Sequence, residues 1–258
     1  MDLELEGKVV LVTGGSTGLG RALARRLVDE QAKVAICARG EEQLRAAAEE
    51  LRAAGGDVLD LVVDVSAPTE LARLVGATVE RFGRLDGLVN NAGRSAAKPV
   101  DATTDAEWDE DLQLKLYAAV RLVRLALPEL RKSRGAILNV LAIAAKAPAG
   151  GSAPSSVSRA AGMALTKALS KELGPEGIRV NAVLIGMVES AQYERMAAAA
   201  GRDLADFYRE LGAGAGIPLG RMGRAEEFGD LAAYLLSPRA SYVTGVAVNL
   251  DGGLSAAV

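Results

Sequence analysis

The chain has no histidine and a single cysteine. Without imidazole there is no histidine to act as a general base or a metal ligand, so any acid or base must be another kind of side chain. One cysteine can form neither an internal disulfide nor a multi-cysteine metal site, and we therefore predict no metal centre. Because Cys37 ends the apolar run Val34-Ala35-Ile36, we expect it to be a buried, unreactive thiol.

Long apolar runs and a strong charge of one sign are also missing. No segment approaches the roughly 20 apolar residues that span a bilayer, and Met1 is followed by acidic residues rather than by a signal sequence. The net charge is only −3 and half of the residues are apolar, which is typical of a soluble globular protein. We therefore expect a cytoplasmic protein with neither a nucleic-acid nor a membrane partner.

What the sequence does contain is a regular alternation of short β-branched runs with longer stretches of helix-forming residues. The runs are almost continuously apolar, as parallel strands are when helices cover both faces, and the stretches between them have a helical period. The expected strands are residues 8–13, 33–38, 57–63, 86–90, 135–141, 178–184 and 243–249. The expected helices are residues 18–30, 41–54, 68–82, 105–131, 155–173 and 225–236.

This order predicts the α/β fold class, with one doubly wound (Rossmann-type) parallel sheet of about seven strands and helices on both faces. We expect residues 1–258 to form a single dinucleotide-binding domain. Residues 186–224 interrupt the alternation with Met-, Ala- and Gly-rich helical pieces. Because insertions after a strand lie over the ligand crevice of such sheets, we predict a lid-like insertion; a surface excursion or an oligomer contact is the alternative.

The first expected strand runs directly into a glycine-rich turn and then a helix. In such a turn, backbone amides can approach a pyrophosphate at the positive end of the helix dipole. A strand before the turn and a helix after it are the context that distinguishes a dinucleotide site from an ordinary tight turn. The residues predicted to bind the cofactor here are Gly14, Ser16, Thr17, Gly18, Leu19 and Gly20.

The end of the second strand bears on which dinucleotide binds. An acidic residue that would hold the ribose of NAD is absent, since Ala38 cannot make that bond. Arg39, one position later, could pair with a 2′-phosphate, which favours NADP(H) over NAD(H). Asp64 and Val65 follow the third strand and would lie at the adenine, while the small residues of Asn90-Asn91-Ala92-Gly93 let the backbone approach the cofactor.

Four motifs resemble one family in the same order along the chain: residues 13–20, Asn90-Asn91-Ala92-Gly93, residues 178–183 and Asp251-Gly252-Gly253. The whole chain resembles a short-chain dehydrogenase/reductase, which implies an NAD(P)-dependent oxidoreductase and a homo-oligomer, either a dimer or a tetramer. The resemblance also implies that Asn91, Ala92, Gly93, Gly186, Val188 and Ser190 line the cofactor site, with the Val188 backbone at the nicotinamide carboxamide.

The resemblance departs from the family at the catalytic positions. The family uses a Tyr-x-x-x-Lys pair, an upstream serine and an asparagine on the preceding helix. Here Ser155 stands at the tyrosine, Arg159 at the lysine, Ala142 at the serine and Lys115 at the asparagine. A serine hydroxyl is a far weaker acid than a phenol, whose pKa is about 10. Arg159 could still donate to ribose hydroxyls, although a guanidinium does not release its proton.

Two side chains are the leading candidates for a substitute proton donor. Lys115 could carry its ammonium into the space that the phenol vacates, where burial and Arg159 would lower its pKa. It would act there as an acid or bind an anionic substrate; otherwise it reaches solvent or satisfies a backbone carbonyl. Tyr193 is the only tyrosine expected near the mouth of the site on the lid side. Water is the third possible donor.

Three functions remain open from the sequence. The first is an oxidoreductase acting on a carbonyl, an alcohol or a related group of a small, largely apolar substrate, with a non-standard proton donor. The second is a redox-neutral lyase, isomerase or cyclase on the same fold. The third is a catalytically silent subunit that pairs with an active homologue in a hetero-oligomer. The family resemblance favours the first.

Overall fold

A seven-stranded parallel sheet forms the centre of the molecule, in the order β3-β2-β1-β4-β5-β6-β7. The computed structural model describes residues 1–258. Its strands are β1 (Val9–Thr13), β2 (Lys33–Ala38), β3 (Val58–Val62), β4 (Gly87–Asn90), β5 (Ala136–Ala142), β6 (Arg179–Ile185) and β7 (Ala247–Leu250). All five residues of β1 are buried, as expected for a central strand with helices on both sides. The predicted fold class is confirmed.

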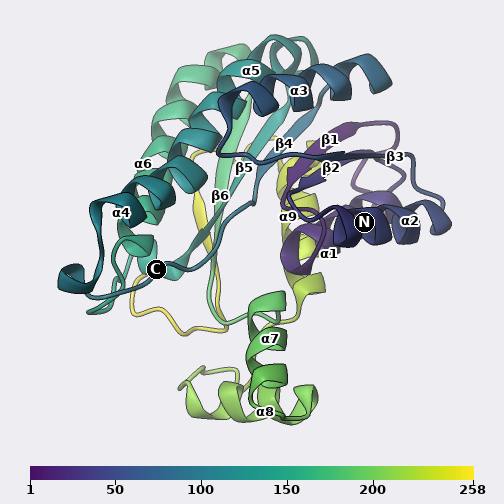
Figure 1. Ribbon diagram of the computed structural model, residues 1–258. Helices are drawn as coiled ribbons and strands as arrows, with labels where there is room; N and C mark the ends of the chain where they lie inside the picture. The colour runs from purple at the N-terminus through teal and green to yellow at the C-terminus, as the bar shows by residue number, and fades with distance from the viewer.

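Helices pack on both faces of the sheet (Figure 1). One face carries α1 (Gly18–Asp29), α2 (Glu41–Ala53) and α9 (Ala225–Leu236), whose apolar residues share one core cluster. The other carries α3 (Pro68–Phe82), α5 (Ala118–Ser133) and α6 (Ser155–Leu173), which contribute to a second cluster. None of the helices combines the length and the apolar composition that a membrane crossing would require.

The helix predicted over residues 105–131 is present, but it is not a regular α-helix throughout. The structure divides it into α4 (Asp105–Leu112), a π-helical turn over Gln113–Tyr117, and α5. In that turn the Ala118 N–H donates to the carbonyl of Gln113, five residues earlier, so one extra residue enters the helical path. Such turns are rare and frequently occur at functional sites. Lys115 lies at the centre of this one.

The seventh strand begins later than the sequence predicts. Val243 was expected to open it, but the strand covers Ala247–Leu250. Gly245 has a φ of +71°, a left-handed conformation that interrupts an extended chain. The apolar residues before Gly245 therefore belong to the connection that leads into the strand.

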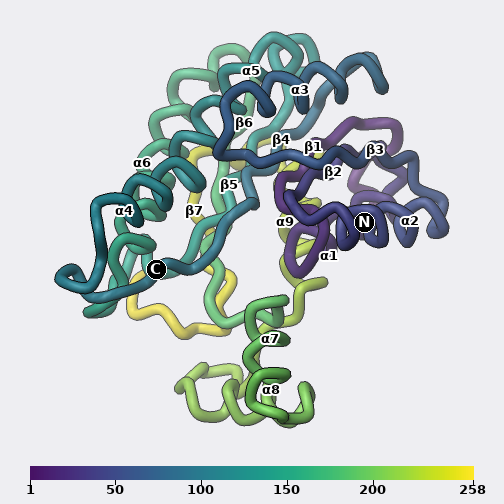
Figure 2. Tube along the Cα trace, viewed as in Figure 1, coloured from purple at the N-terminus to yellow at the C-terminus, as the bar shows by residue number.

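The segment that breaks the alternation forms two helices, α7 (Ala191–Ala199) and α8 (Leu204–Gly214). They extend away from the sheet, below it in the view of Figure 1, and the tube in Figure 2 shows the chain leaving β6 for them and returning to α9. The root of this excursion lies beside the carboxyl ends of the strands. This arrangement brings α7 to the edge of the cleft described next.

Candidate active site

A cleft of about 720 Å³ opens at the carboxyl ends of the strands, where the order reverses between β1 and β4. In doubly wound sheets this reversal is where ligands bind. Every residue predicted to bind the cofactor lines this one cleft: Gly14, Ser16, Thr17, Gly18, Leu19, Gly20, Arg39, Asp64, Val65, Asn91, Ala92, Gly93, Arg159, Gly186, Val188 and Ser190. The sequence therefore identified residues that are far apart in the chain and close together in space.

The glycine-rich turn is too tight for a side chain at Gly20, and Gly14 adopts a backbone conformation that favours glycine. Gly14 has a φ of +67°, and a Cβ added to Gly20 would lie 2.2 Å from the Gly14 carbonyl oxygen. That contact is with backbone, which cannot move aside without reshaping the turn. The cradle between β1 and α1 is thus kept open for a group that binds backbone amides, and it fits the diphosphate of a dinucleotide.

Hydrogen bonds join this turn to the loop that follows β4. The Thr13 hydroxyl oxygen accepts from the backbone N–H of Asn91 at 2.9 Å and of Ala92 at 3.0 Å. In return the Asn91 side-chain amide donates to the carbonyls of Thr13 and Gly14, at 2.8 and 3.1 Å. The two segments that form the floor of the cleft are held as one unit.

Arg39 stands at the outer end of the cleft, just after β2. Its side chain is exposed and takes part in none of the ion pairs of the structure, so its guanidinium remains available to a ligand. Asp64, nearby, is engaged locally, since its carboxylate accepts from the Ser66 N–H at 2.8 Å. No carboxylate follows β2 directly, where one would repel a 2′-phosphate.

Ser155 lines the opposite wall of the cleft, and Lys115 lies behind it at an inner cavity. The Lys115 ammonium donates to the Ser155 hydroxyl oxygen at 2.8 Å and forms an ion pair with Asp111, one turn earlier. The side chains of Lys115 and Asp111 are only 2% and 1% exposed. The backbone N–H of Ala96 donates to the same Ser155 oxygen, also at 2.8 Å. The hydroxyl of Ser155 therefore accepts two hydrogen bonds at the surface of the cleft.

Some neighbours of Lys115 lower its pKa and one neighbour raises it. Burial lowers the pKa of Lys115, because the charged form loses water, and the positive charges of Arg159 and Arg94 lower it further. The carboxylate of Asp111 opposes them and favours the ammonium. The result is a pKa below the ordinary value of a lysine.

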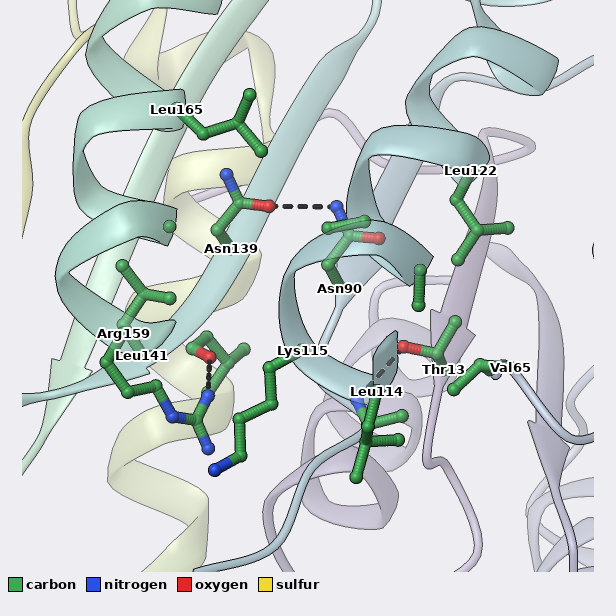
Figure 3. Close-up of a pocket in the computed structure, with 15 residues that line it drawn as sticks. Thr13, Val65, Asn90, Leu114, Lys115, Leu122, Asn139, Leu141, Arg159 and Leu165 are labelled. Carbon is green, nitrogen blue, oxygen red and sulfur yellow. Dashed lines mark hydrogen bonds between the residues drawn. The ribbon is translucent and has the colours of Figure 1, made fainter. Parts of the chain in front are cut away.

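Arg159 lies beside this pair in α6. Its guanidinium donates to the Val140 carbonyl at 2.6 Å, and its other terminal nitrogen would lie 3.0 Å from a Cβ placed on Gly93. Burial lowers the pKa of Arg159, an effect that Asp111 opposes, but a guanidinium stays charged at neutral pH. Figure 3 shows the charged ends of Lys115 and Arg159 pointing into the same space, beside an inner cavity of about 20 Å³.

Comparison with known proteins agrees with this geometry. A family model described as enoyl-(acyl carrier protein) reductase matches residues 14–255. The chain belongs to the short-chain dehydrogenase/reductase family. It is 39% identical over 248 residues to an L-fucose dehydrogenase from Oryctolagus cuniculus, covering 96% of this chain and 84% of the relative. The oxidoreductase class that the sequence favours is that of the family.

Two solved structures of this short-chain family are especially similar. The NADPH-bound short-chain oxidoreductase from Pseudomonas aeruginosa PAO1, which contains an atypical catalytic centre, has 36% identity and a TM-score of 0.92 and covers 97% of this chain and 98% of its own. L-sorbose reductase from Gluconobacter frateurii, complexed with NADPH and L-sorbose, has 31% identity and a TM-score of 0.93, with both chains covered completely. Both neighbours bind NADPH, the cofactor that Arg39 favours in the sequence.

The structure also shows what each of the other candidate residues contacts. Lys115 neither reaches solvent nor satisfies a backbone carbonyl, the two alternatives that the sequence left open. Ala142, at the end of β5, lines the cleft without offering a polar group. Tyr193, on α7, also lines the cleft; burial raises the pKa of its phenol, and no hydrogen bond joins it to Lys115 or Ser155.

Two groups around Lys115 and Ser155 were missed by the sequence analysis. Asp111 precedes Lys115 by four residues, a spacing at which oppositely charged side chains commonly pair on a helix. That spacing was the available signal. The sequence contains no signal for the Ala96 N–H. A backbone donor becomes recognisable only when the loop after β4 is placed against the first turn of α6.

Proposed function

We propose that this chain is an NADP(H)-dependent reductase of carbonyl substrates in which Lys115 supplies the proton through Ser155. The observation that supports this proposal is the 2.8 Å hydrogen bond from the buried Lys115 ammonium to the hydroxyl of Ser155, the residue of this pair that lines the cofactor cleft. It provides a proton donor at the place where the family's tyrosine is missing. The atypical set of Lys115, Ser155 and Arg159, with Ala142, is part of the proposal.

The cofactor would be held along the floor of the cleft. Amides of the glycine-rich turn would bind its diphosphate and Arg39 its 2′-phosphate. Arg159 would donate to the nicotinamide ribose, and the backbone around Val188 would meet the carboxamide. When bound, NADPH supplies the hydride that reduces the carbonyl carbon.

Ser155 cannot serve as the acid by itself, because an aliphatic hydroxyl holds its proton too tightly. Its oxygen, however, accepts hydrogen bonds from Lys115 and from Ala96, so its own proton is free to point at a substrate oxygen. As that proton leaves, the two donors stabilise the negative charge that develops on Ser155. Lys115 then gives a proton to the serine, which restores the hydroxyl.

The ion pair with Asp111 supplies this relay with its proton. It favours the ammonium form of Lys115, which is the form that can release a proton. The positive charges of Lys115 and Arg159 also stabilise an alkoxide forming on the substrate. The buried carboxylate thereby keeps Lys115 in the protonated form that the reduction step requires at neutral pH.

The segment from residue 186 to residue 224 would serve as the lid of this site. Its helix α7 places Tyr193, Gln192 and Arg195 at the mouth of the cleft. The substrate side of the cleft combines apolar residues such as Leu141 with polar ones such as Ser152. We therefore expect a small carbonyl compound with polar substituents beside an apolar portion, taken up under the lid.

The test measures cofactor binding and turnover separately. NADPH is titrated by fluorescence, and its oxidation is then followed with a panel of ketoses, cyclic diketones and 3-oxoacyl thioesters. Lys115→Met and Ser155→Ala are each expected to lower kcat about 100-fold or more while NADPH affinity changes little. Because Lys115→Met leaves Asp111 unpaired in the interior, the double variant with Asp111→Asn provides a matched control for folding.

Tyr193→Phe decides between the two candidate donors. If that variant loses turnover while Lys115→Met retains it, the proposed relay is wrong. NADPH binding without turnover of any carbonyl in the panel would favour a redox-neutral enzyme. A folded protein that does not bind NADPH at all would favour the catalytically silent subunit.

A further inference from the structure

Ser155 has the surroundings of a nucleophile as well as those of a proton relay. Its hydroxyl opens into the cleft and lies 2.8 Å from an amine that is almost completely buried. A serine becomes nucleophilic when an adjacent base can take its proton, and a desolvated lysine is one such base. In the reductase this pair would release a proton; in its deprotonated state it would instead take one from Ser155.

Two features stabilise an anionic oxygen at Ser155. The Ala96 N–H and the Lys115 nitrogen both donate to it, each at 2.8 Å. Ser155 is also the first residue of α6, a helix of 19 residues whose positive dipole end faces the hydroxyl. Both effects lower the free energy of the alkoxide relative to that of an ordinary serine.

The charges around the amine determine when it can act as a base. Asp111 contacts it from α4 and favours the ammonium, whereas Arg159 from α6 and Arg94 from the loop after β4 favour the neutral form. Arg94 itself is paired with Glu110, so part of its charge is balanced. The neutral amine therefore becomes more abundant as the pH rises. Asp111 opposes this change because its carboxylate favours the ammonium.

We propose that Ser155 is also an acyl-accepting nucleophile, with Lys115 as its base, toward activated esters and thioesters of small acids. The Ser155 oxygen forms a bond to the acyl carbon as its proton passes to the Lys115 nitrogen. The bond from that carbon to the leaving alkoxide or thiolate breaks, and Lys115 returns the proton to the leaving group. Water then hydrolyses the acyl-serine and regenerates the hydroxyl, so no electrons are exchanged.

The activity is tested on the whole chain without cofactor, using a fluorophosphonate probe and locating the adduct by peptide mass spectrometry. We expect labelling at Ser155 and none in Ser155→Ala. Lys115→Met should slow labelling about 100-fold, the contribution of a general base. Ser95→Ala is the matched control, because Ser95 lines the same cleft and has no lysine partner; its labelling rate should equal that of the unmodified protein.

Asp111→Asn separates this activity from the reductase. The substitution removes the charge that holds Lys115 protonated, so labelling at neutral pH should rise severalfold while carbonyl reduction falls. Labelling that spreads over several serines, that is unchanged in Lys115→Met, or that falls in Asp111→Asn would overturn the proposal. If Asp111→Asn does not fold, the pH profile decides: labelling must rise with pH in the unmodified protein and lose that rise in Lys115→Met.

Because labelling needs neither NADPH nor a carbonyl, the two activities can fail independently. A protein that reduces ketones through Lys115 but is not labelled at Ser155 would retain the proposed function and lose this inference. A protein that is labelled at Ser155 but reduces no carbonyl compound would support this inference and contradict the proposed function.

Discussion

The two walls of the cleft are held in place by different means. The cofactor wall consists of backbone and small residues, joined by the hydrogen bonds between Thr13 and Asn91. The catalytic wall depends on charged side chains, with Lys115 and Asp111 buried together in a helix. A backbone cradle tolerates many changes in its surroundings, whereas a proton path depends on a few atoms. The cofactor wall therefore depends on backbone geometry, whereas the opposite wall depends on a few charged side chains.

The largest effect is expected from a change that breaks the cofactor wall at its backbone. In Gly20→Ala the new Cβ would lie 2.2 Å from the Gly14 carbonyl oxygen, so the turn must deform. Strain of about 3 kcal/mol corresponds to roughly 100-fold weaker NADPH binding, measured by fluorescence titration. Gly76→Ala is the control, because a Cβ at Gly76 meets nothing and the residue is an exposed helical position. Equal NADPH affinity in both variants would mean that the turn does not hold the diphosphate.

A smaller effect is expected where a single side chain adds to the same wall. Arg39→Ala removes the free guanidinium at the outer end of the cleft. NADPH binding should weaken about tenfold, the value of a charge-assisted hydrogen bond. NADH is the control ligand, because it lacks the 2′-phosphate and should bind the variant as it binds the unmodified protein. If Arg39→Ala weakens the binding of NADPH and NADH equally, Arg39 does not contact the 2′-phosphate.

The smallest effect is a shift of the pH profile, and it concerns the catalytic wall alone. Lys115 releases a proton only while it is an ammonium, so carbonyl reduction should be fastest at low pH and fall as the pH rises through its pKa. Because burial lowers that pKa, the fall should begin at a lower pH than for an exposed lysine. Asp111→Asn removes the carboxylate that opposes this effect, so it should move the fall to a still lower pH. A profile that does not move would exclude Lys115 as the acid.

The cofactor wall could be predicted from the sequence because its signals are local. The glycines at 14, 18 and 20 follow one another within a few residues, and Arg39 follows directly after a strand. Parallel strands bring such local signals to one edge of the sheet, so the fold itself assembles them. The only strand whose position was clearly misjudged, β7, begins later because Gly245 bends the chain before it.

The catalytic wall could be predicted only in part. The residue types were recognisable at Lys115, Ser155 and Arg159, but their contacts depend on the register of a helix that contains a π-helical turn. A regular period of 3.6 residues does not contain this extra residue, so the sequence treated residues 105–131 as one continuous helix. The position of Asp111 relative to Ser155, and the approach of the Ala96 N–H, follow from tertiary packing between α4, α6 and a loop.

The close approach of Arg159 to Gly93 brings the two walls of the cleft together. A Cβ at residue 93 would lie 3.0 Å from a terminal nitrogen of this guanidinium, a tight contact. Glycine at 93 therefore leaves room for the guanidinium of Arg159. A larger residue at position 93 would require the terminal nitrogen of Arg159 to move by a few tenths of an ångström, away from the place where it faces Lys115.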